Sequence, residues 1–162
     1  KKIKDTWPKQ EIHAHVMSEK PTKLVENILD YADLIFVHFE ITENLDKIRK
    51  LIISKNKKFG VAITLKTDPK KILNILKKSS SLLILSVDNP GFSGQNFNSK
   101  AFKYIDFFND LKFRSKFRIC IDGGVNKNIV KILDVDDVVS NSSILDSNDP
   151  VNEIANLKSV DY

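Results

Sequence analysis

The stretch LLILSVDNPGFSGQ, from Leu82 to Gln95, decides how the rest of the chain is interpreted. Residues 82–87 form an apolar run of strand length, and residues 89–95 hold a proline and two glycines, with a helical pattern following at 99–111. A strand that ends in a glycine-rich loop before a helix is a common phosphate-binding arrangement, because glycines let backbone N–H groups approach an anion. The same loop is compatible with an ordinary turn between a strand and a helix.

A second stretch, ICIDGGV from Ile119 to Val125, repeats this order of features. An apolar strand ends in a carboxylate, Asp122, and two glycines come next. The repetition favours a fold in which several strands end at one ligand-binding edge.

The whole chain alternates between strand and helix patterns. Strands are predicted at 11–16, 34–38, 59–65, 82–87, 118–121 and 135–140, and helices are predicted to begin near Pro21, Asn44, Asp68, Ser99, Asn126 and Asp149. Strict alternation predicts a parallel sheet with helical crossovers, either doubly wound or barrel-like.

Composition excludes several classes of protein. The 162 residues are enough for one domain with a sizeable core. The net charge is +5, but the lysines are scattered and only three of 26 basic residues are arginine, so nucleic-acid binding is not expected. No apolar run approaches the ~20 residues that span a bilayer. A single cysteine, Cys120, argues against a disulfide framework and for a reducing, cytoplasmic compartment.

Polar side chains gather where the predicted strands end. His13 and His15 alternate on the first strand, and His38 and Glu40 on the second, so each pair shares one face. A single strand histidine is usually a satisfied core or loop residue. Three histidines and a carboxylate at one edge instead favour a metal site or an acid–base site.

In order and spacing, these residues resemble the ribulose-phosphate 3-epimerase family. The likeness covers nearly all of the chain, and its most specific parts are the loop at 89–95 and the strand end at 122–125. The motifs that carry it are His15-Val16-Met17, Phe36-Val37-His38-Phe39-Glu40, Gly60-Val61-Ala62-Ile63, Asn89-Pro90-Gly91-Phe92-Ser93-Gly94-Gln95, Asp122-Gly123-Gly124-Val125 and Ser142-Ser143-Ile144.

The resemblance implies a fold and a domain organisation. The family fold is an α/β, TIM-type (β/α)8 barrel, of which this chain matches about six parallel βα units. On this interpretation residues 1–162 form a single ribulose-phosphate-binding domain, and the N-terminal quarter of the family fold, its first two βα units, is absent. Barrels of this kind often associate, so a homo-oligomer is also expected.

The resemblance implies a reaction as well. The family consists of isomerases of carbohydrate metabolism, in the pentose phosphate pathway. They interconvert ribulose 5-phosphate and xylulose 5-phosphate by proton transfer at C3, through an enediolate. A divalent metal, commonly zinc or iron, with manganese or cobalt as alternatives, stabilises the oxyanion. The implied partner is a small sugar phosphate, with no nucleic acid and no membrane.

Individual roles follow from the same resemblance. Asp122 matches a residue that is both a metal ligand and a catalytic acid–base carboxylate, and His15 matches a second metal ligand. The positions that match substrate- and phosphate-contacting residues are His15, Met17, Gly91, Phe92, Ser93, Gly94, Gly123, Gly124, Asn141 and Ser142.

The chain also departs from the family pattern. The other metal-binding histidine and the second catalytic aspartate belong to a strand that this chain does not match. His13 stands where the family usually has Asp, and Ser93 and Asn141 replace glycines. Asn141 is expected to keep the glycine backbone path, because asparagine tolerates positive φ. Two alternatives therefore stay open: a degenerate, non-catalytic sugar-phosphate-binding relative, and another phosphate-binding α/β enzyme with a convergent loop.

Overall fold

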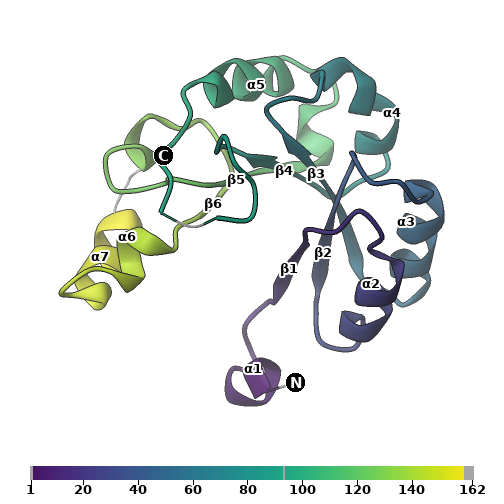
Figure 1. Cartoon of the computed structure of the whole chain (residues 1–162), viewed down its shortest axis with the longest axis horizontal. Helices are drawn as coiled ribbons and strands as arrows, with labels where there is room; N and C mark the ends of the chain where they lie inside the picture. Colours follow the sequence, from purple (N-terminus) through teal and green to yellow (C-terminus); the bar gives the residue numbers. More distant parts are fainter. Residues whose placement is uncertain (1, 93, 159–162) are drawn as a thin grey trace.

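The structure is a computed structural model that describes residues 2–92 and 94–158. Six parallel strands form one sheet and lie in it in the order in which they occur in the chain. Figure 1 shows this sheet curling, with helices on its outer side. The strands are β1 (His13–Val16), β2 (Leu34–His38), β3 (Lys58–Thr64), β4 (Ser81–Leu85), β5 (Arg118–Asp122) and β6 (Asp137–Val139).

Helices and short 3₁₀ turns connect the strands. Two of the predicted helix starts are confirmed by their caps: the Asn44 side chain accepts a hydrogen bond from the Lys47 N–H, and that of Asp68 accepts one from the Lys70 N–H. The helices are α1 (Lys2–Thr6), α2 (Thr22–Ile28), α3 (Leu45–Ser54), α4 (Leu73–Leu76), α5 (Lys100–Asn109), α6 (Ser142–Leu145) and α7 (Pro150–Lys158), and the 3₁₀ turns are η1 (Pro69–Ile72), η2 (Arg114–Lys116) and η3 (Val130–Ile132).

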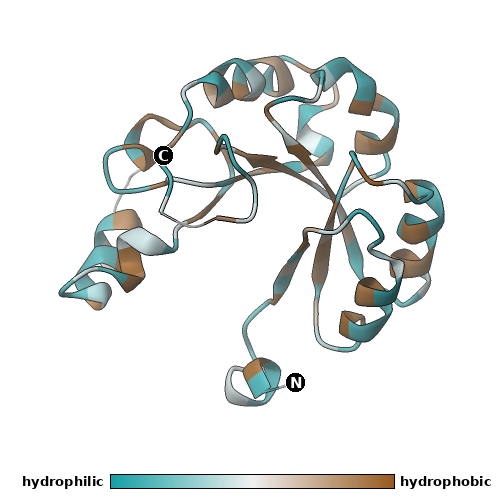
Figure 2. Ribbon diagram, in the orientation of Figure 1, coloured by the Kyte–Doolittle hydropathy of each residue, from teal (hydrophilic) through white to brown (hydrophobic). Residues whose placement is uncertain are grey.

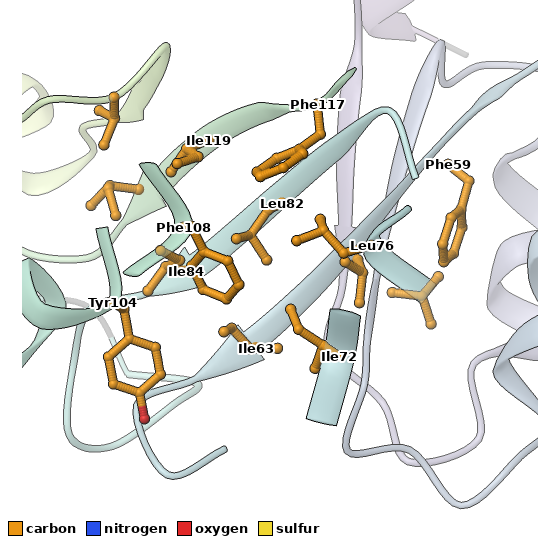
Figure 3. Close-up of a cluster of buried hydrophobic side chains, with 14 of the residues drawn as sticks. Phe59, Ile63, Ile72, Leu76, Leu82, Ile84, Tyr104, Phe108, Phe117 and Ile119 are labelled. Carbon is orange, nitrogen blue, oxygen red and sulfur yellow. The ribbon is translucent and has the colours of Figure 1, made fainter. Parts of the chain in front are cut away.

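The main core lies between the sheet and these helices. Alternate strand residues point to this outer face, where Phe59, Leu82 and Ile119 meet the helical side chains Leu76 and Phe108 (Figure 3). Burying one such side chain contributes about 1.5 to 3 kcal/mol to the free energy of folding. Figure 2 shows the resulting pattern, with apolar strands inside and polar residues on the outer helix faces.

The other strand residues form a second, smaller cluster on the inner face of the curl. Because β2, β3, β4 and β5 contribute apolar side chains to both faces, they have almost continuous apolar runs. This inner cluster consists of Leu34, Phe36, Ala62, Leu83, Leu85, Val87 and Cys120. It fills the inner face below the carboxyl ends of the strands.

The strand order decides between the two folds that the sequence left open, a doubly wound sheet and a barrel. In a doubly wound sheet the strand order reverses at an internal point and helices cover both faces. Here the order never reverses, and α2, α3, α4 and α5 lie on the outer side of the curl (Figure 1). The sheet is therefore a curled half-barrel, and the predicted α/β class with six parallel strands is confirmed.

One local prediction was wrong, and one short helix was missed. The helix expected from Asn126 is the single 3₁₀ turn η3, because Leu133 is already extended and leads directly into β6. The short helix α6 was not predicted, since its four residues give too little periodicity to recognise. Across residues 2–92 and 94–158, no helix has the length and hydrophobicity needed to cross a bilayer.

Candidate functional site

The carboxyl ends of the strands bring three titratable side chains together on the inner face. His15 is the third residue of β1, His38 ends β2 and Asp122 ends β5. The period of two along a strand places them above the inner cluster, on the side away from the helices. The side chains of His15 and His38 are largely buried, at 14% and 11% exposure.

These side chains and Glu40 form a continuous hydrogen-bonded chain. The Asp122 Oδ2 atom lies 3.2 Å from His15 Nδ1, and His15 Nε2 lies 2.8 Å from His38 Nε2. His38 Nδ1 in turn lies 3.0 Å from Glu40 Oε2. The two imidazole rings are stacked, with centroids 4.9 Å apart. We call this set the Asp–His–His–Glu chain.

Glu40 closes the chain at its far end. Its Oε1 atom accepts hydrogen bonds from the Thr64 N–H (2.8 Å), the Thr64 hydroxyl (3.0 Å) and the Thr67 hydroxyl. Burial alone raises the pKa of a carboxyl group, but the hydrogen bonds from His38, Thr64 and Thr67 outweigh it and lower the pKa of Glu40 to about 2. Glu40 is therefore a fixed carboxylate at neutral pH.

A cavity of about 270 Å³ opens beside Asp122. It lies between the ends of β4, β5 and β6 and the loops that follow them. The lining residues are Met17, Leu85, Val87, Gly91, Phe92, Gly94, Gln95, Asp122, Gly123, Gly124, Val125, Val139, Asn141 and Ser142. Asp122 is the one carboxylate among these described lining residues, and its side chain is 27% exposed.

The loop after β4 is held in shape by the side chain of Gln95. The Gln95 Oε1 atom accepts a hydrogen bond from the Asn89 N–H (3.0 Å), and Nε2 donates to the carbonyl oxygens of Asn89 (2.6 Å) and Phe92 (2.7 Å). At the base of the loop, the Asn98 amide donates to Asp88 (2.6 Å). The loop is thus a closed structure on one wall of the cavity.

The loop after β5 packs tightly against the segment that leads into α5. Gly124 has φ +67°, and a Cβ atom at this position would overlap the backbone of Asn96 and Phe97. The Ser86 hydroxyl donates to the carbonyl oxygens of Asp122 (2.9 Å) and Gly123 (2.8 Å). These contacts fix the direction in which the Asp122 side chain leaves the strand.

Most of the residues singled out from the sequence are brought together. Of the ten predicted substrate- and phosphate-contacting positions, eight line the cavity: Met17, Gly91, Phe92, Gly94, Gly123, Gly124, Asn141 and Ser142. His15 lies next to the cavity through its contact with Asp122. Ser93 lies outside the described residues.

Two expectations differ from the structure. His13 faces Glu11 and the ring of Phe36, so it does not join His15 in the Asp–His–His–Glu chain. Asn141 has φ −117° and therefore does not use the left-handed conformation of a glycine. Sequence reasoning also did not assign roles to Ser86 and Thr67, because their contacts are made with residues brought near only by the fold. It assigned none to Gln95 either, whose bonds to Asn89 and Phe92 are local but depend on the shape of the loop.

Comparison with known proteins identifies the relationship. A model described as the ribulose-phosphate 3 epimerase family matches residues 1–145. The chain belongs to this family. Relatives named ribulose-phosphate 3-epimerase include one from Aquifex aeolicus (strain VF5), 31% identical over 155 residues, which are 92% of this chain and 69% of that one. Another, from Buchnera aphidicola subsp. Baizongia pistaciae, is 39% identical over 103 residues, 62% of this chain and 45% of that one.

The chain is shorter than the epimerases that it matches. It covers 45% of the Buchnera relative and 71% of one from Helicobacter pylori (strain J99). Among solved structures, 3-hexulose-6-phosphate synthase from Salmonella typhimurium is similar with a TM-score of 0.76 and 20% identity, over 98% of this chain and 76% of that one. That likeness supports the barrel-type fold alone.

Membership of this family is consistent with a divalent cation, and the described residues offer part of a site. His15 Nδ1 and Asp122 Oδ2 lie 3.2 Å apart, close to the separation of about 3.4 Å between two tetrahedral ligands that each lie about 2.1 Å from a zinc ion. Across residues 2–92 and 94–158, no group of three His, Cys, Asp or Glu side chains is suited to a metal. Burial raises the pKa of the Cys120 thiol to about 12, and this side chain belongs to the inner cluster and not to the cavity lining. The pair fits as two ligands of a larger set.

Proposed function

We propose that this chain carries the substrate site of a ribulose-phosphate 3-epimerase, with Asp122 as one proton-transferring carboxylate. The substrates would be ribulose 5-phosphate and xylulose 5-phosphate, which differ in configuration at C3. The observation that carries the proposal is the position of Asp122. Its carboxylate lines the cavity enclosed by the two glycine loops and at the same time contacts His15.

The proposed chemistry needs a base at C3 and stabilisation of the charge that develops on the neighbouring oxygen. Asp122 is partly exposed to the cavity, so its carboxylate can reach a bound sugar. His15 and Asp122 would hold the divalent cation, zinc or iron in the first instance, which supplies positive charge next to the oxyanion when bound. Ser86 supports Asp122 by fixing the strand end on which it sits.

The phosphate group would lie against the glycine loops. Gly91 and Gly94 on one wall and Gly123 and Gly124 on the other line the same cavity. Glycine-rich turns present backbone N–H groups without side chains in the way, which suits an anion. Ser142 adds a hydroxyl group to the lining.

A second candidate function is sugar-phosphate binding without inversion. Inversion needs an acid or base on each face of C3, but Asp122 is the one carboxylate among the described residues that line the cavity. A chain with this lining would bind the phosphate and exchange the C3 proton on one face alone, or not at all.

The test is proton exchange at C3 of ribulose 5-phosphate in D2O, followed by NMR with added Zn²⁺ or Fe²⁺. We expect exchange with the wild-type chain and a loss of about 10²- to 10⁴-fold in Asp122→Asn, the usual contribution of a general base. Affinity for the sugar phosphate should be retained. Asp88→Asn is the matched control, because Asp88 contacts Asn98 at the base of the loop and does not line the cavity.

The outcomes separate the two functions. Exchange with inversion supports the epimerase. Binding of ribulose 5-phosphate without exchange supports the second candidate. Exchange that survives unchanged in Asp122→Asn contradicts the role of Asp122 and, with it, the proposed function.

A further inference from the structure

Gln95 lines the cavity, but the proposed function gives its side chain no part. Its amide oxygen accepts from the Asn89 N–H, and its amide nitrogen donates to the carbonyl oxygens of Asn89 and Phe92, at 2.6 and 2.7 Å. A glutamine side chain has two N–H donors, so both are already used within the loop. Gln95 therefore has no free donor for a ligand, and its position beside the cavity needs another explanation.

We propose that Gln95 is a positioning residue, which holds the loop after β4 in the conformation that binds the phosphate group of the substrate. In this role its side chain contacts the backbone of the loop and not the ligand. The inference rests on the proposed function for the place of the phosphate, between the two glycine loops. The contacts of Gln95 follow from the structure alone.

Packing does not give this loop its shape. Gly91 and Gly94 have positive φ values, +94° and +75°, and no heavy atom outside the adjoining residues lies within 4 Å of a Cβ added to either. The side chain of Phe92 between them is 76% exposed. Glycine is the most flexible residue, so a segment with two unpacked glycines needs another constraint to keep one conformation.

The amide of Gln95 supplies that constraint. It makes three hydrogen bonds to the backbone of residues 89–92. In the described part of the chain, the backbone of residues 89–92 and 94 makes no hydrogen bond besides these three. The bonds join the start of the segment, at Asn89, to its end, so they span both glycines. The conformation of the segment therefore depends on this one side chain.

The same bonds decide which polar groups of the loop are left for an anion. The carbonyl oxygens of Asn89 and Phe92 are held by Gln95 and are not free to face a ligand. The N–H groups of Gly91, Phe92 and Gly94, which line the cavity, have no acceptor among the described residues. Free backbone N–H groups in a turn attract an anion, whereas free carbonyl oxygens repel it. The loop that Gln95 holds is thus suited to a phosphate group.

Without the Gln95 amide, the loop would have to be ordered at the moment of binding. Ordering the backbone of one further residue lowers affinity by about 5- to 30-fold. Two carbonyl oxygens would also be released beside the anion. The loss should fall on binding and not on proton transfer, because the contacts of Asp122 with His15 and Ser86 do not involve this loop.

The test is Gln95→Met, which keeps the length of the side chain and removes all three hydrogen bonds. The first measurement is the affinity for inorganic phosphate, from a titration followed by the backbone amide signals of Gly91 and Gly94 in ¹H–¹⁵N NMR. We expect the affinity to fall by about 5- to 30-fold. Gln10→Met is the matched control and should leave the affinity unchanged, because Gln10 precedes β1 at the amino end of the sheet and does not line the cavity.

The second measurement separates a positioning role from a general loss of structure. In the C3 exchange assay, Gln95→Met should raise the KM for ribulose 5-phosphate by a similar factor and leave kcat nearly unchanged. The loop would hold the phosphate group equally well in the ground state and in the transition state, and the loss of such uniform binding raises KM alone. A fall in kcat at unchanged KM would overturn the inference.

A third measurement needs no variant to fold. In the wild-type chain the side-chain NH2 signals of Gln95 should lie downfield of those of the exposed Gln10, because both Gln95 protons are hydrogen-bonded. They should change little as phosphate is added, while the backbone amide signals of Gly91 and Gly94 move. A large shift of the Gln95 side-chain signals would show that this amide binds the phosphate itself and would overturn the positioning role, as would two glycine signals that stay in place.

The inference and the proposed function fail in different ways. Weaker phosphate binding in Gln95→Met, together with no C3 exchange in the wild-type chain, would support the positioning role and contradict the epimerase. Exchange in the wild type, with the same KM and the same phosphate affinity in Gln95→Met, would contradict the positioning role and leave the role of Asp122 standing.

Discussion

Gly124 shows how closely the backbone of the site is packed. It has a left-handed φ of +67°, and an added Cβ would overlap the backbone at Asn96 and Phe97. We expect Gly124→Ala to lower the free energy of unfolding by about 2 to 4 kcal/mol, the combined cost of a strained backbone and an overpacked contact. Urea denaturation followed by circular dichroism measures the change.

Gly91 is the matched control for this prediction. It also has a positive φ, +94°, but no heavy atom lies within 4 Å of an added Cβ. Gly91→Ala should therefore show the strain alone, about 1 to 2 kcal/mol. If Gly124→Ala and Gly91→Ala lowered the free energy of unfolding equally, the overlap with Asn96 and Phe97 would have no part in the destabilisation.

For single residues, the sequence predicted which residue types form the site better than it predicted which side chains contact one another. Asp122 and the glycines after it were recognisable because they end a strand of strong apolar character, and His15 because it lies near the end of the first predicted strand. The pair His38 and Glu40 was visible as two residues on one face. Its contact with His15 depends on the packing of β1 beside β2 and on side-chain rotamers, which no local pattern encodes.

Among the elements, α5 and the segment after β3 are joined by Tyr104. Its buried hydroxyl donates to the carbonyl oxygens of Leu65 and Thr67, each at 2.9 Å. Tyr104→Phe removes the donor from both carbonyls, so we expect the free energy of unfolding to fall by about 1 to 2 kcal/mol. Because the Thr67 hydroxyl holds Glu40, the ¹⁵N signals of His38 should shift as well.

Tyr31→Phe is the control at this scale, because Tyr31 is an exposed side chain after α2. Its effect on stability should be within about 0.5 kcal/mol. A Tyr104→Phe variant as stable as Tyr31→Phe would show that water replaces the lost donor at Leu65 and Thr67.

The elements themselves followed from the sequence where local and tertiary preferences agree. Asn44 and Asp68 cap helices at the predicted places, since their side chains bond the first free N–H groups of the turn. The segment after Asn126 has helical spacing but forms one 3₁₀ turn. There the short path to β6, whose Asp137 pairs with Cys120, leaves no room for a longer helix.

For the whole molecule, alternation alone left two folds open, because a doubly wound sheet and a barrel share the same order of strands and helices along the chain. The difference lies in which strands pair, which is a long-range property. The family resemblance supplied the barrel, and the sequential strand order confirmed its winding as a half-barrel.

Hydrogen-bonded carboxylates spread over the molecule give it a predictable response to acid. The Ile12 N–H lowers the pKa of Asp33 at the amino end of the sheet. At Asp136 burial acts in the opposite direction, but the Ile119 N–H and a nearby guanidinium outweigh it and lower the pKa. Together with Glu40, whose pKa is about 2, these groups bind protons more weakly in the folded than in the unfolded chain.

These lowered pKa values make the folded chain less stable in acid. Because the folded pKa values lie below the unfolded ones, the stabilisation is complete above about pH 5 and is lost as the pH falls toward 2. We expect the free energy of unfolding, measured in urea, to be lower at pH 3 than at pH 7.

In Asp33→Asn this difference should shrink by about 1 kcal/mol, a modest amount because the Asp33 side chain is partly exposed. Asp30→Asn, at an exposed neighbouring position, should leave the difference unchanged. A chain as stable at pH 3 as at pH 7 would contradict the role assigned to these carboxylates.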